Sequence, residues 1–272
     1  MLLSIIVPVG DIDSWRECEK SIVSSVIGQG PVGVEVLPCY DLECSGAQIA
    51  RNEGLSKARG EWIAWVDCDD QVEKNWFAEI SNAIVAHPEV DLIQFDASED
   101  RDGRVYSHEY RYKCFVEGEQ FAHELLRNDG MPAWLWTRVF RRELFDGLKF
   151  EGRVKHDYGM FLRVLPRVKG VWSIGKPLYR YNRSGTGLSS YAQQMDYGIA
   201  GRKFEEYIGE LPREWKNDAK IGLALTMADV ARHSGCENGS RQFVRKYMWQ
   251  VICDRKVPFR LKIKTLFAAM SL

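Results

Sequence analysis

The chain has 272 residues and a formal net charge of −1, with 45% hydrophobic and 28% charged residues. This length suits one large domain or a domain with an appendage, and the apolar fraction is enough for a substantial core. The composition excludes a mostly disordered chain, and the near-neutral charge gives no reason to expect a nucleic-acid partner.

The cysteine pattern indicates a reducing compartment, so we expect a cytoplasmic protein. The seven cysteines are an odd number and contain no C-x-x-C spacing, which argues against a disulfide framework or a zinc site. The alternative, a metal bound by Cys39 and Cys44, lacks a nearby histidine. No signal peptide is expected, since the apolar first nine residues lack a basic region. No stretch approaches the ~20 apolar residues that span a bilayer.

Strands and helices alternate through the first half of the chain. The β-branched run at 2–7 predicts a strand buried on both faces, and Ser14 with Glu17 predicts a capping box that starts the first helix. A short strand at 32–37 should stop at Pro38. The next expected elements are a helix at 47–58, a strand at 62–66, a helix at 75–86, a strand at 90–95 and a hairpin into a polar strand at 105–112. This alternation predicts an α/β fold with a mixed, mostly parallel central sheet flanked by helices.

The second half of the chain becomes helical. The expected elements are a helix at 119–127, a strand at 170–181, and helices at 193–208, 212–232 and 240–253. We therefore predict a core domain at 1–190 and a helical C-terminal region at 191–272 that packs on it.

Three carboxylates, Asp67, Asp69 and Asp70, follow the strand at 62–66 within four residues. Open α/β sheets bind their ligands at the carboxyl ends of buried strands, and carboxylates crowded there repel one another unless a cation lies between them. Oxygen ligands suit Mg²⁺ or Mn²⁺, which often bridge a carboxylate to a phosphate. The pattern predicts a metal–diphosphate site. The alternative is a solvated loop in which Asp70 caps the next element.

Five segments in order form a larger pattern. They are SIIVPV at 4–9, the ARNEG…DCDD stretch at 50–70, WTRVFRRELF at 136–145, KHDY at 155–158 and LYRYNRSGTGLS at 178–189. In this order they resemble the motifs of the family 2 glycosyltransferases. The resemblance implies a GT-A nucleotide-sugar-binding fold at 1–190. It also implies an inverting transfer from a nucleoside-diphosphate sugar to an acceptor hydroxyl in polysaccharide or glycolipid biosynthesis.

Carried over residue by residue, the resemblance implies roles for five side chains. Asp67 would face the ribose or the metal, and Asp69 would ligate Mn²⁺ or Mg²⁺. Arg51 would contact the nucleotide, Arg183 the diphosphate, and Asp157 would be the catalytic base. The chemistry agrees, because a diphosphate leaving group develops charge that a divalent ion stabilises, and an attacking hydroxyl needs a base.

Four further residues are candidate substrate contacts. Pro8 belongs to the opening strand motif, and His156 stands where the family has Glu. Trp134 is a candidate for stacking on the acceptor, although aromatic side chains more often fill cores. Asp41 is the candidate for recognising the base, usually uridine. It follows Leu-Pro-Cys-Tyr, where the family has V-D-D-G-S.

The expected partners are a UDP-sugar donor and a carbohydrate or lipid-linked acceptor. The segment at 255–267 alternates basic and apolar residues. It lies either on the anionic inner face of the cell membrane or on the core as a terminal helix with a solvated basic face.

Two other classes of function stay open. The altered stretch at 39–41 is compatible with a non-catalytic nucleotide-sugar-binding or scaffold protein. A sugar nucleotidyltransferase would combine a similar nucleotide site with a carboxylate-bound metal, but no glycine-rich loop of that type follows the first strand.

Overall fold

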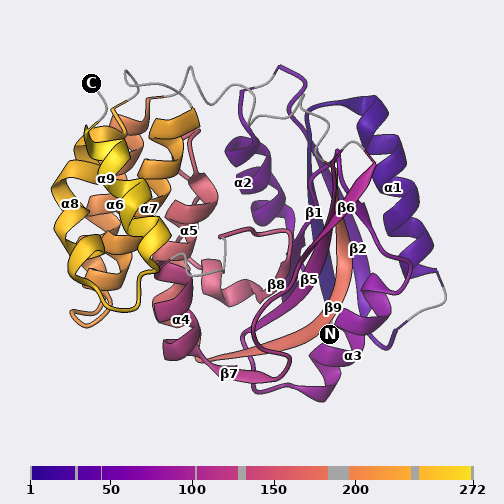
Figure 1. Cartoon of the computed structure of the whole chain (residues 1–272). Helices are drawn as coiled ribbons and strands as arrows, with labels where there is room; N and C mark the ends of the chain where they lie inside the picture. Colours follow the sequence, from indigo (N-terminus) through magenta and orange to yellow (C-terminus); the bar gives the residue numbers. More distant parts are fainter. Residues whose placement is uncertain are drawn as a thin grey trace. The chain divides into compact units, whose positions relative to one another are not determined.

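A computed structural model describes residues 2–27, 30–43, 45–101, 103–127, 133–182, 196–233 and 239–270. These residues form two compact units, most of whose elements are labelled in Figure 1. The sheet unit takes in the described residues of 1–118, 134–150 and 167–187, and the helical unit takes in those of 119–133, 151–166 and 188–272. The domain boundary at residue 190 stays a prediction.

The sheet unit contains all the described strands. Its elements are β1 (Leu2–Val9), α1 (Ile12–Val26), β2 (Gly33–Tyr40), α2 (Ala47–Lys57), β3 (Trp62–Trp65), β4 (Gln71–Val72), α3 (Trp76–Ala86), β5 (Leu92–Arg101), β6 (Arg104–His108), β7 (Phe115–Glu117), β8 (Arg138–Arg141), the 3₁₀ turn η1 (Arg142–Phe145) and β9 (Gly170–Asn182).

The described strands form one sheet in the order β2-β1-β3-β8-β5-β9-β4, with β6 on β5 and β7 on β9. β1 is parallel to β2 and β3, and β5 is parallel to β9, whereas β8 is antiparallel to both of its neighbours. Five of the seven strands on this path therefore run in one direction, with β8 and β4 opposed. This confirms the predicted mixed, mostly parallel sheet.

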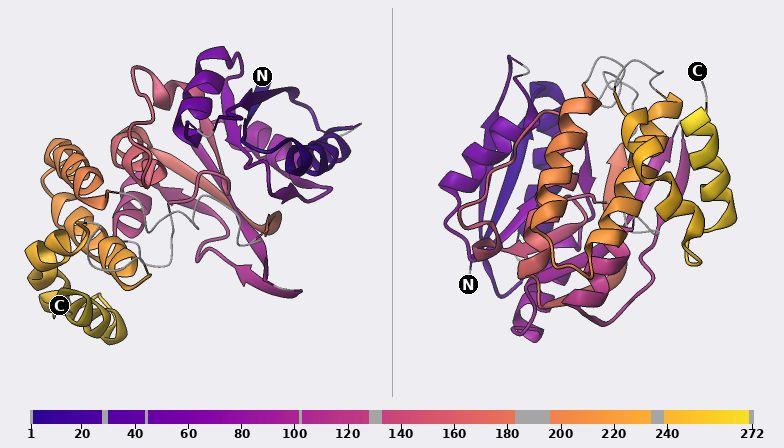
Figure 2. Two further views of the ribbon diagram at one scale, coloured as in Figure 1. Left: turned by 90° about the horizontal axis from the view of Figure 1, so that it is seen from above. Right: turned by 90° about the vertical axis from the view of Figure 1, so that its left-hand side faces the viewer.

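The helical unit contains α4 (Gly118–Leu126), α5 (His156–Val164), α6 (Tyr197–Glu210), α7 (Lys216–His233), α8 (Arg241–Cys253) and α9 (Phe259–Met270). Buried Arg127 joins three of its segments, because its guanidinium donates to Asp218 at 2.6 Å and to Asp254 at 2.7 Å. Helices α8 and α9 pack against α7 and against each other, and Figure 2 shows α9 in yellow at the end of the chain. None of the described helices has the length and apolar character needed to cross a membrane.

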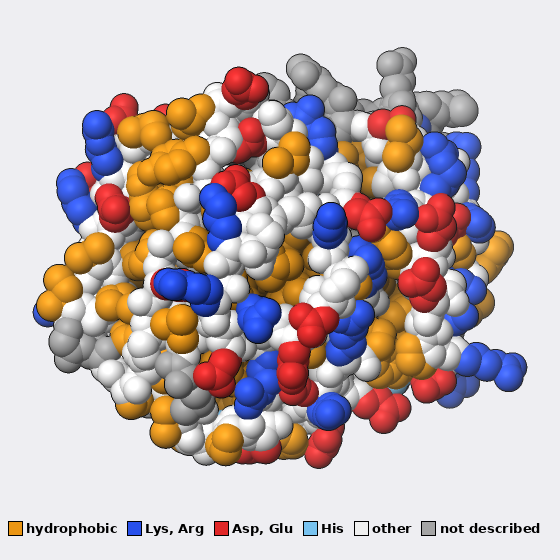
Figure 3. Space-filling view, turned by 180° about the vertical axis from the view of Figure 1, so that it is seen from behind, with side chains coloured by type: hydrophobic (Ala, Val, Ile, Leu, Met, Phe, Trp, Pro, Cys, Tyr) orange, Lys and Arg blue, Asp and Glu red, His pale blue; other side chains and the backbone are white. Residues whose placement is uncertain are grey.

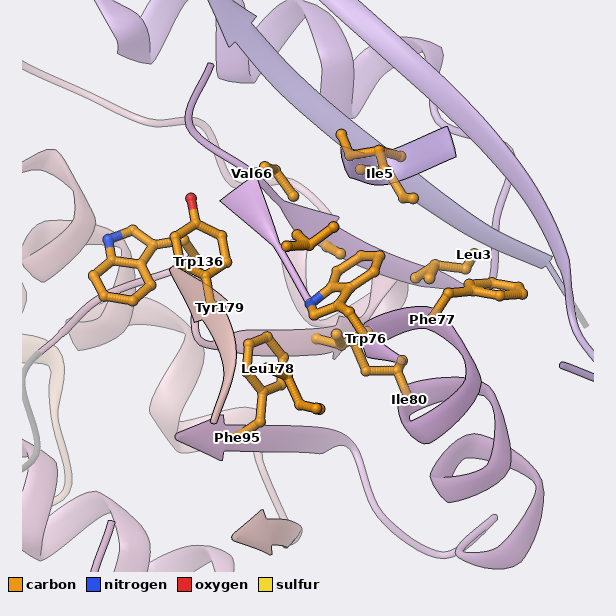
Figure 4. Packing of buried hydrophobic residues seen from close by; sticks show 14 of the residues in the cluster. Leu3, Ile5, Val66, Trp76, Phe77, Ile80, Phe95, Trp136, Leu178 and Tyr179 are labelled. Atoms are coloured by element: carbon orange, nitrogen blue, oxygen red, sulfur yellow. The ribbon is translucent and has the colours of Figure 1, made fainter. Parts of the chain in front are cut away.

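Strand β1 is buried on both faces, as its apolar run predicts. Leu3 and Ile5 lie in a cluster with α1 and α3 side chains, among them Trp76 (Figure 4). Ile6 follows Ile5, points to the opposite face of the strand and faces α2. The two-residue period of a strand thus places one set of side chains against each helical layer.

Gly54 allows α2 to approach β1 closely. A Cβ at this position would lie 2.3 Å from Cγ2 of Ile6 and 3.1 Å from Sγ of Cys39. Ile6 is β-branched and fully buried, so it has little freedom to move aside. We expect Gly54→Ala to lower the free energy of unfolding by about 1–3 kcal/mol, measured by chemical denaturation.

Gly209 provides the matched control for this substitution. It is exposed in α6, and a Cβ there would have nothing within 4 Å. Gly209→Ala should raise the free energy of unfolding by roughly 0.5–1 kcal/mol, because alanine restricts the unfolded chain. Equal effects of the two substitutions would contradict the close packing at Gly54.

Two local predictions are wrong, each for a physical reason. Helix α1 begins earlier than expected, since Asp11 is its N-cap and accepts a hydrogen bond from the Ser14 N–H at 2.7 Å. Ser14 therefore lies inside the helix, not at a capping box. Strand β2 continues through Pro38 to Tyr40, because β2 is the edge of the sheet, and a proline is tolerated on an edge strand.

Glu35 connects β2 to β1 and to the turn before β3. Its carboxylate accepts hydrogen bonds from Ser4 Oγ at 2.6 Å and from the Arg59 N–H at 2.7 Å, and Arg59 Nε donates to its other oxygen at 2.9 Å. Desolvation opposes the charge, but the hydrogen bonds from Ser4 and Arg59 outweigh it and lower the pKa of Glu35 to about 2.

This lowered pKa predicts an acid-dependent contribution to stability. The contribution is complete above the unfolded-state pKa of about 4.3, and it is lost as pH falls toward 2. At neutral pH, Glu35→Gln should lower the free energy of unfolding, because it removes the charge that accepts these hydrogen bonds. The expected loss is only about 1–2 kcal/mol, since Arg59 is exposed and solvent screens the pair. Urea denaturation across this pH range should show the two proteins converging at low pH, and a constant difference would contradict the linkage.

Candidate functional site

An acidic turn, residues 67–70, follows β3 at the edge where the parallel strands end. Val66 N–H donates to the Ile6 carbonyl at 3.1 Å, which extends the pairing of β3 with β1 to the start of the turn. The Asp70 N–H donates to the Asp67 carbonyl at 3.1 Å and closes the turn. The Asp41 N–H donates to the Val9 carbonyl at 2.8 Å, so β2 ends at the same edge.

Arg51 and Asp67 form a partly buried ion pair. Arg51 belongs to α2 and is only 4% exposed, and its Nη2 lies 2.8 Å from Oδ1 of Asp67. The guanidinium carbon also lies 6.0 Å from the centre of the Phe150 ring. The sequence motif thus brings these two predicted site residues into contact, with the positive charge held beside the acidic turn.

Asp69 is half-buried beside Asp67. Desolvation by burial, and then the negative charge of Asp67, raise the pKa of Asp69 to about 6. A carboxylate with a raised pKa lacks compensation for its charge, and a cation placed beside it would provide that compensation. The arrangement favours a positively charged ligand at this end of the turn.

Asp70 has a different environment, because it is buried and hydrogen-bonded. The Tyr179 hydroxyl donates to its Oδ2 at 2.7 Å, and the Asn182 N–H donates to its Oδ1 at 2.7 Å. The same hydroxyl accepts the Asp67 N–H at 3.1 Å. Desolvation, together with Asp67 and Asp69, holds the pKa of Asp70 well above its ordinary value. Asp70 and Tyr179 therefore fix the turn to β9. Tyr179 was not among the predicted site residues, although it stands in the motif at 178–189.

A row of stacked aromatic rings begins at Tyr179. Its ring stacks on Trp136 at 4.6 Å between centroids, and Trp136 stacks on Trp134 at 4.7 Å and on Tyr181 at 5.5 Å. Figure 4 shows Tyr179 beside Trp136. Trp136 is buried, whereas Trp134 is half-buried at the end of the row. Trp136 thus packs in the core, whereas the ring of Trp134 is more accessible to solvent than that of Trp136.

Two further candidates lie at the ends of β1 and β2. Pro8 is buried within β1. Asp41 uses both carboxylate oxygens to bind backbone, accepting the Ser45 N–H at 2.8 Å and the Gly46 N–H at 2.6 Å. These bonds hold the loop that leads into α2, so Asp41 has a structural role in this loop.

The candidate base lies in the helical unit. Asp157 is in the first turn of α5, and its Oδ1 lies 3.1 Å from Nε2 of the neighbouring His156. The preceding residue, Lys155, has φ of 47°, a left-handed conformation uncommon for residues other than glycine. Arg183, the predicted diphosphate contact, lies outside the described residues, as does Cys44.

The donor groups of the acidic turn suit a shared metal site. Among the described residues, no cluster of three or more His, Cys, Asp or Glu side chains could hold a metal ion. Asp67 and Asp69 nevertheless fit Mg²⁺ or Mn²⁺, because such ions are commonly bound by one or two carboxylates and complete their coordination with substrate phosphates and water. The raised pKa of Asp69 supports this fit.

Comparison with known proteins gives glycosyltransferases among the relatives. The model of the family "Glycosyl transferase family 2" matches residues 40–161. The glycosyltransferase GlyA of Streptococcus pneumoniae serotype 4 is 22% identical over 217 residues, which cover 69% of this chain and 31% of GlyA. The chain spans about a third to a half of the length of the curated relatives GlyA and Bacillus subtilis EpsH, a putative glycosyltransferase.

Solved structures show the same fold. The crystal structure of S. aureus TarS 1–349 in complex with UDP has a TM-score of 0.68 at 14% identity, covering 98% of this chain and 87% of that one. The mannosyltransferase PcManGT from Pyrobaculum calidifontis, in complex with GDP-Man and Mn²⁺, has a TM-score of 0.52 at 15% identity, covering 98% and 85%. The GT-A fold expected from the sequence is therefore confirmed.

Proposed function

We propose that this chain is a member of glycosyl transferase family 2 and transfers a sugar from a nucleoside-diphosphate sugar to an acceptor hydroxyl. The observation that carries the proposal is the acidic turn at the carboxyl end of β3, with Arg51 paired to Asp67 and the pKa of Asp69 raised. Two carboxylates beside the Arg51 guanidinium suit a diphosphate that is bound through a divalent metal ion.

The residues of the turn and their partners would have different roles in binding the donor. Asp67 and Asp69 would hold Mn²⁺ or Mg²⁺, which supplies Lewis-acid stabilisation of the departing diphosphate. Arg51 is paired with Asp67 and would place a positive charge near the nucleotide. Asp70 and Tyr179 fix the backbone of the turn, so its carboxylates need little rearrangement when a donor binds.

Asp157 is the proposed general base. It would take the proton of the acceptor hydroxyl as the oxygen attacks the anomeric carbon, and attack opposite the leaving diphosphate inverts that centre. His156, within 3.1 Å, orients the carboxylate. The left-handed backbone at Lys155 supports a functional role for this segment, since strained residues concentrate at such sites.

The finer parts of the proposal are the donor, the acceptor and the location. We propose a UDP-sugar donor, because UDP is the nucleotide bound to the TarS structure. The acceptor would be a polysaccharide or glycolipid in the cytoplasm, as the family resemblance implies. Trp134, at the accessible end of the aromatic row, is the proposed contact for an acceptor sugar.

A panel of nucleoside-diphosphate sugars, each with and without Mn²⁺, tests the proposal. A bound donor stabilises the native state by mass action, so the melting temperature should rise for the true donor and rise further with Mn²⁺. Donor hydrolysis or transfer must accompany the shift. Release of pyrophosphate from a nucleoside triphosphate would instead identify a nucleotidyltransferase.

One observation favours a second candidate, a non-catalytic nucleotide-sugar-binding protein. Asp41, the predicted base-recognition residue, has both oxygens engaged by the Ser45 and Gly46 N–H groups. A donor that binds without any hydrolysis or transfer would support this candidate over the enzyme.

A further inference from the structure

Helix α9 carries an exposed apolar stripe. Phe259, Phe267 and Met270 are 76%, 68% and 72% exposed, and Ile263 is 37% exposed. At about 100° per residue, these four side chains fall within an arc of roughly 80° on one face of the helix. The buried residues Thr265, Ala268 and Ala269 lie on the other face, which packs on α7 and α8.

Basic side chains flank this stripe on both sides. Lys262 lies beyond one edge of the arc, and Arg260 lies beyond the other. Lys264 lies next to Arg260 on that side and is paired with Asp229 of α7 at 2.6 Å. Between residues 239 and 270 there are eight Lys or Arg residues and one acidic residue, Asp254, which is paired with Arg127. The segment is therefore strongly positive in a chain of net charge −1.

Helix α8 adds an aromatic residue on the side facing α9. Arg245 Nε donates to the Ala269 carbonyl at 2.9 Å, which places this side of α8 against α9. Trp249 follows Arg245 by one helical turn and is 65% exposed. Tryptophan favours the boundary between lipid headgroups and acyl chains.

This pattern differs from an ordinary solvated surface. On the face of the molecule in Figure 3, Lys and Arg side chains alternate with Asp and Glu, and neither sign of charge dominates. Along α9, by contrast, an apolar stripe and basic flanks run together with no acidic residue between Arg255 and Met270. A protein partner would need an acidic surface with an apolar strip, whereas an anionic bilayer offers negative headgroups above an apolar interior everywhere.

We propose that the α9 face, defined by Phe259, Ile263, Phe267 and Met270 with Arg260 and Lys262, binds the surface of an anionic lipid bilayer. The aromatic and aliphatic side chains enter the headgroup–acyl boundary, and the basic side chains contact lipid phosphates. The proposal is based on the apolar stripe, which matches the interior of a bilayer, and on its basic flanks, which match anionic headgroups. It does not depend on the proposed function.

Sedimentation of the whole chain with vesicles tests this. Binding is expected to equimolar phosphatidylglycerol–phosphatidylcholine vesicles, to fall with added salt, and to be at least about tenfold weaker to phosphatidylcholine alone. Phe259→Ser with Phe267→Ser, and separately Arg260→Gln with Lys262→Gln, should each weaken binding at least about tenfold. The matched control is Ile199→Ser with Arg202→Gln on α6, where Ile199 is 62% exposed, and it should bind as the unchanged chain does.

Three outcomes would overturn the proposal. One is no binding of the unchanged chain to the anionic vesicles, and another is equal loss in the α6 control. The third is a change of oligomeric state in the α9 variants with unchanged vesicle binding, which would assign the face to a second copy of the chain. No donor is present in the experiment, so failure of the proposed transferase function would leave its result unaffected.

Discussion

Asp69→Asn is expected to lower the rate of sugar transfer at least about 100-fold. The amide keeps the size of the side chain but removes its charge, which is what a divalent cation binds. Burial and the negative charge of Asp67 raise the pKa of Asp69, which indicates that the described residues compensate its charge only in part. The substitution should therefore leave the fold intact and act on donor binding.

Two measurements separate this role from a general loss of structure. Titration calorimetry should show that Mn²⁺-dependent donor binding is weakened, while the melting temperature of the free protein is unchanged or slightly raised. Asp13→Asn in α1, whose side chain is 86% exposed, serves as the control and should keep full activity. Full activity in Asp69→Asn would remove Asp69 from the site.

Asp157→Asn is expected to lower turnover by about 10²–10⁴-fold while donor affinity is retained. An amide cannot accept the acceptor proton at neutral pH, but it has nearly the same shape and can still contact His156. The helical-unit residue Glu210, exposed at the end of α6, provides the control as Glu210→Gln. Steady-state kinetics with donor and acceptor varied independently would detect the effect in kcat and its absence in the donor KM.

A different pattern would assign Asp157 another role. If the variant lost donor affinity and turnover in parallel, Asp157 would be a binding residue. If donor hydrolysis and transfer both continued at the normal rate, it would be neither base nor contact. The pH dependence adds a further test, because loss of a base removes the acidic limb of the rate profile.

The strand–helix alternation predicted the fold because both faces of β1 are apolar and had to be covered by helices. The carboxyl end of β3 then located the acidic turn, and the resemblance of the stretch at 50–70 to the family motif implied that Arg51 and Asp67 share a site. These features are local, so a single stretch of sequence contains the information.

Other features could not be predicted because they depend on distant pairing. β4 has only two residues and is a strand because it pairs with β9. β8 has four residues and is a strand because it pairs with β3 and β5. Asp70 bonds to Tyr179, a residue 109 positions away, and no local pattern indicates that contact. The engagement of Asp41 by its own loop was likewise absent from the family pattern.

The hydrogen bond between Tyr179 and Asp70 has a consequence for the order of folding. Closing a loop of 109 residues is slow compared with forming a helix or a hairpin, so this contact belongs among the later events. During synthesis, the acidic turn emerges long before the strand that holds it. A ribosome-bound chain that ends before β9 should therefore carry all the carboxylates of the turn and still fail to retain a donor. Donor capture would then report that the sheet has been completed.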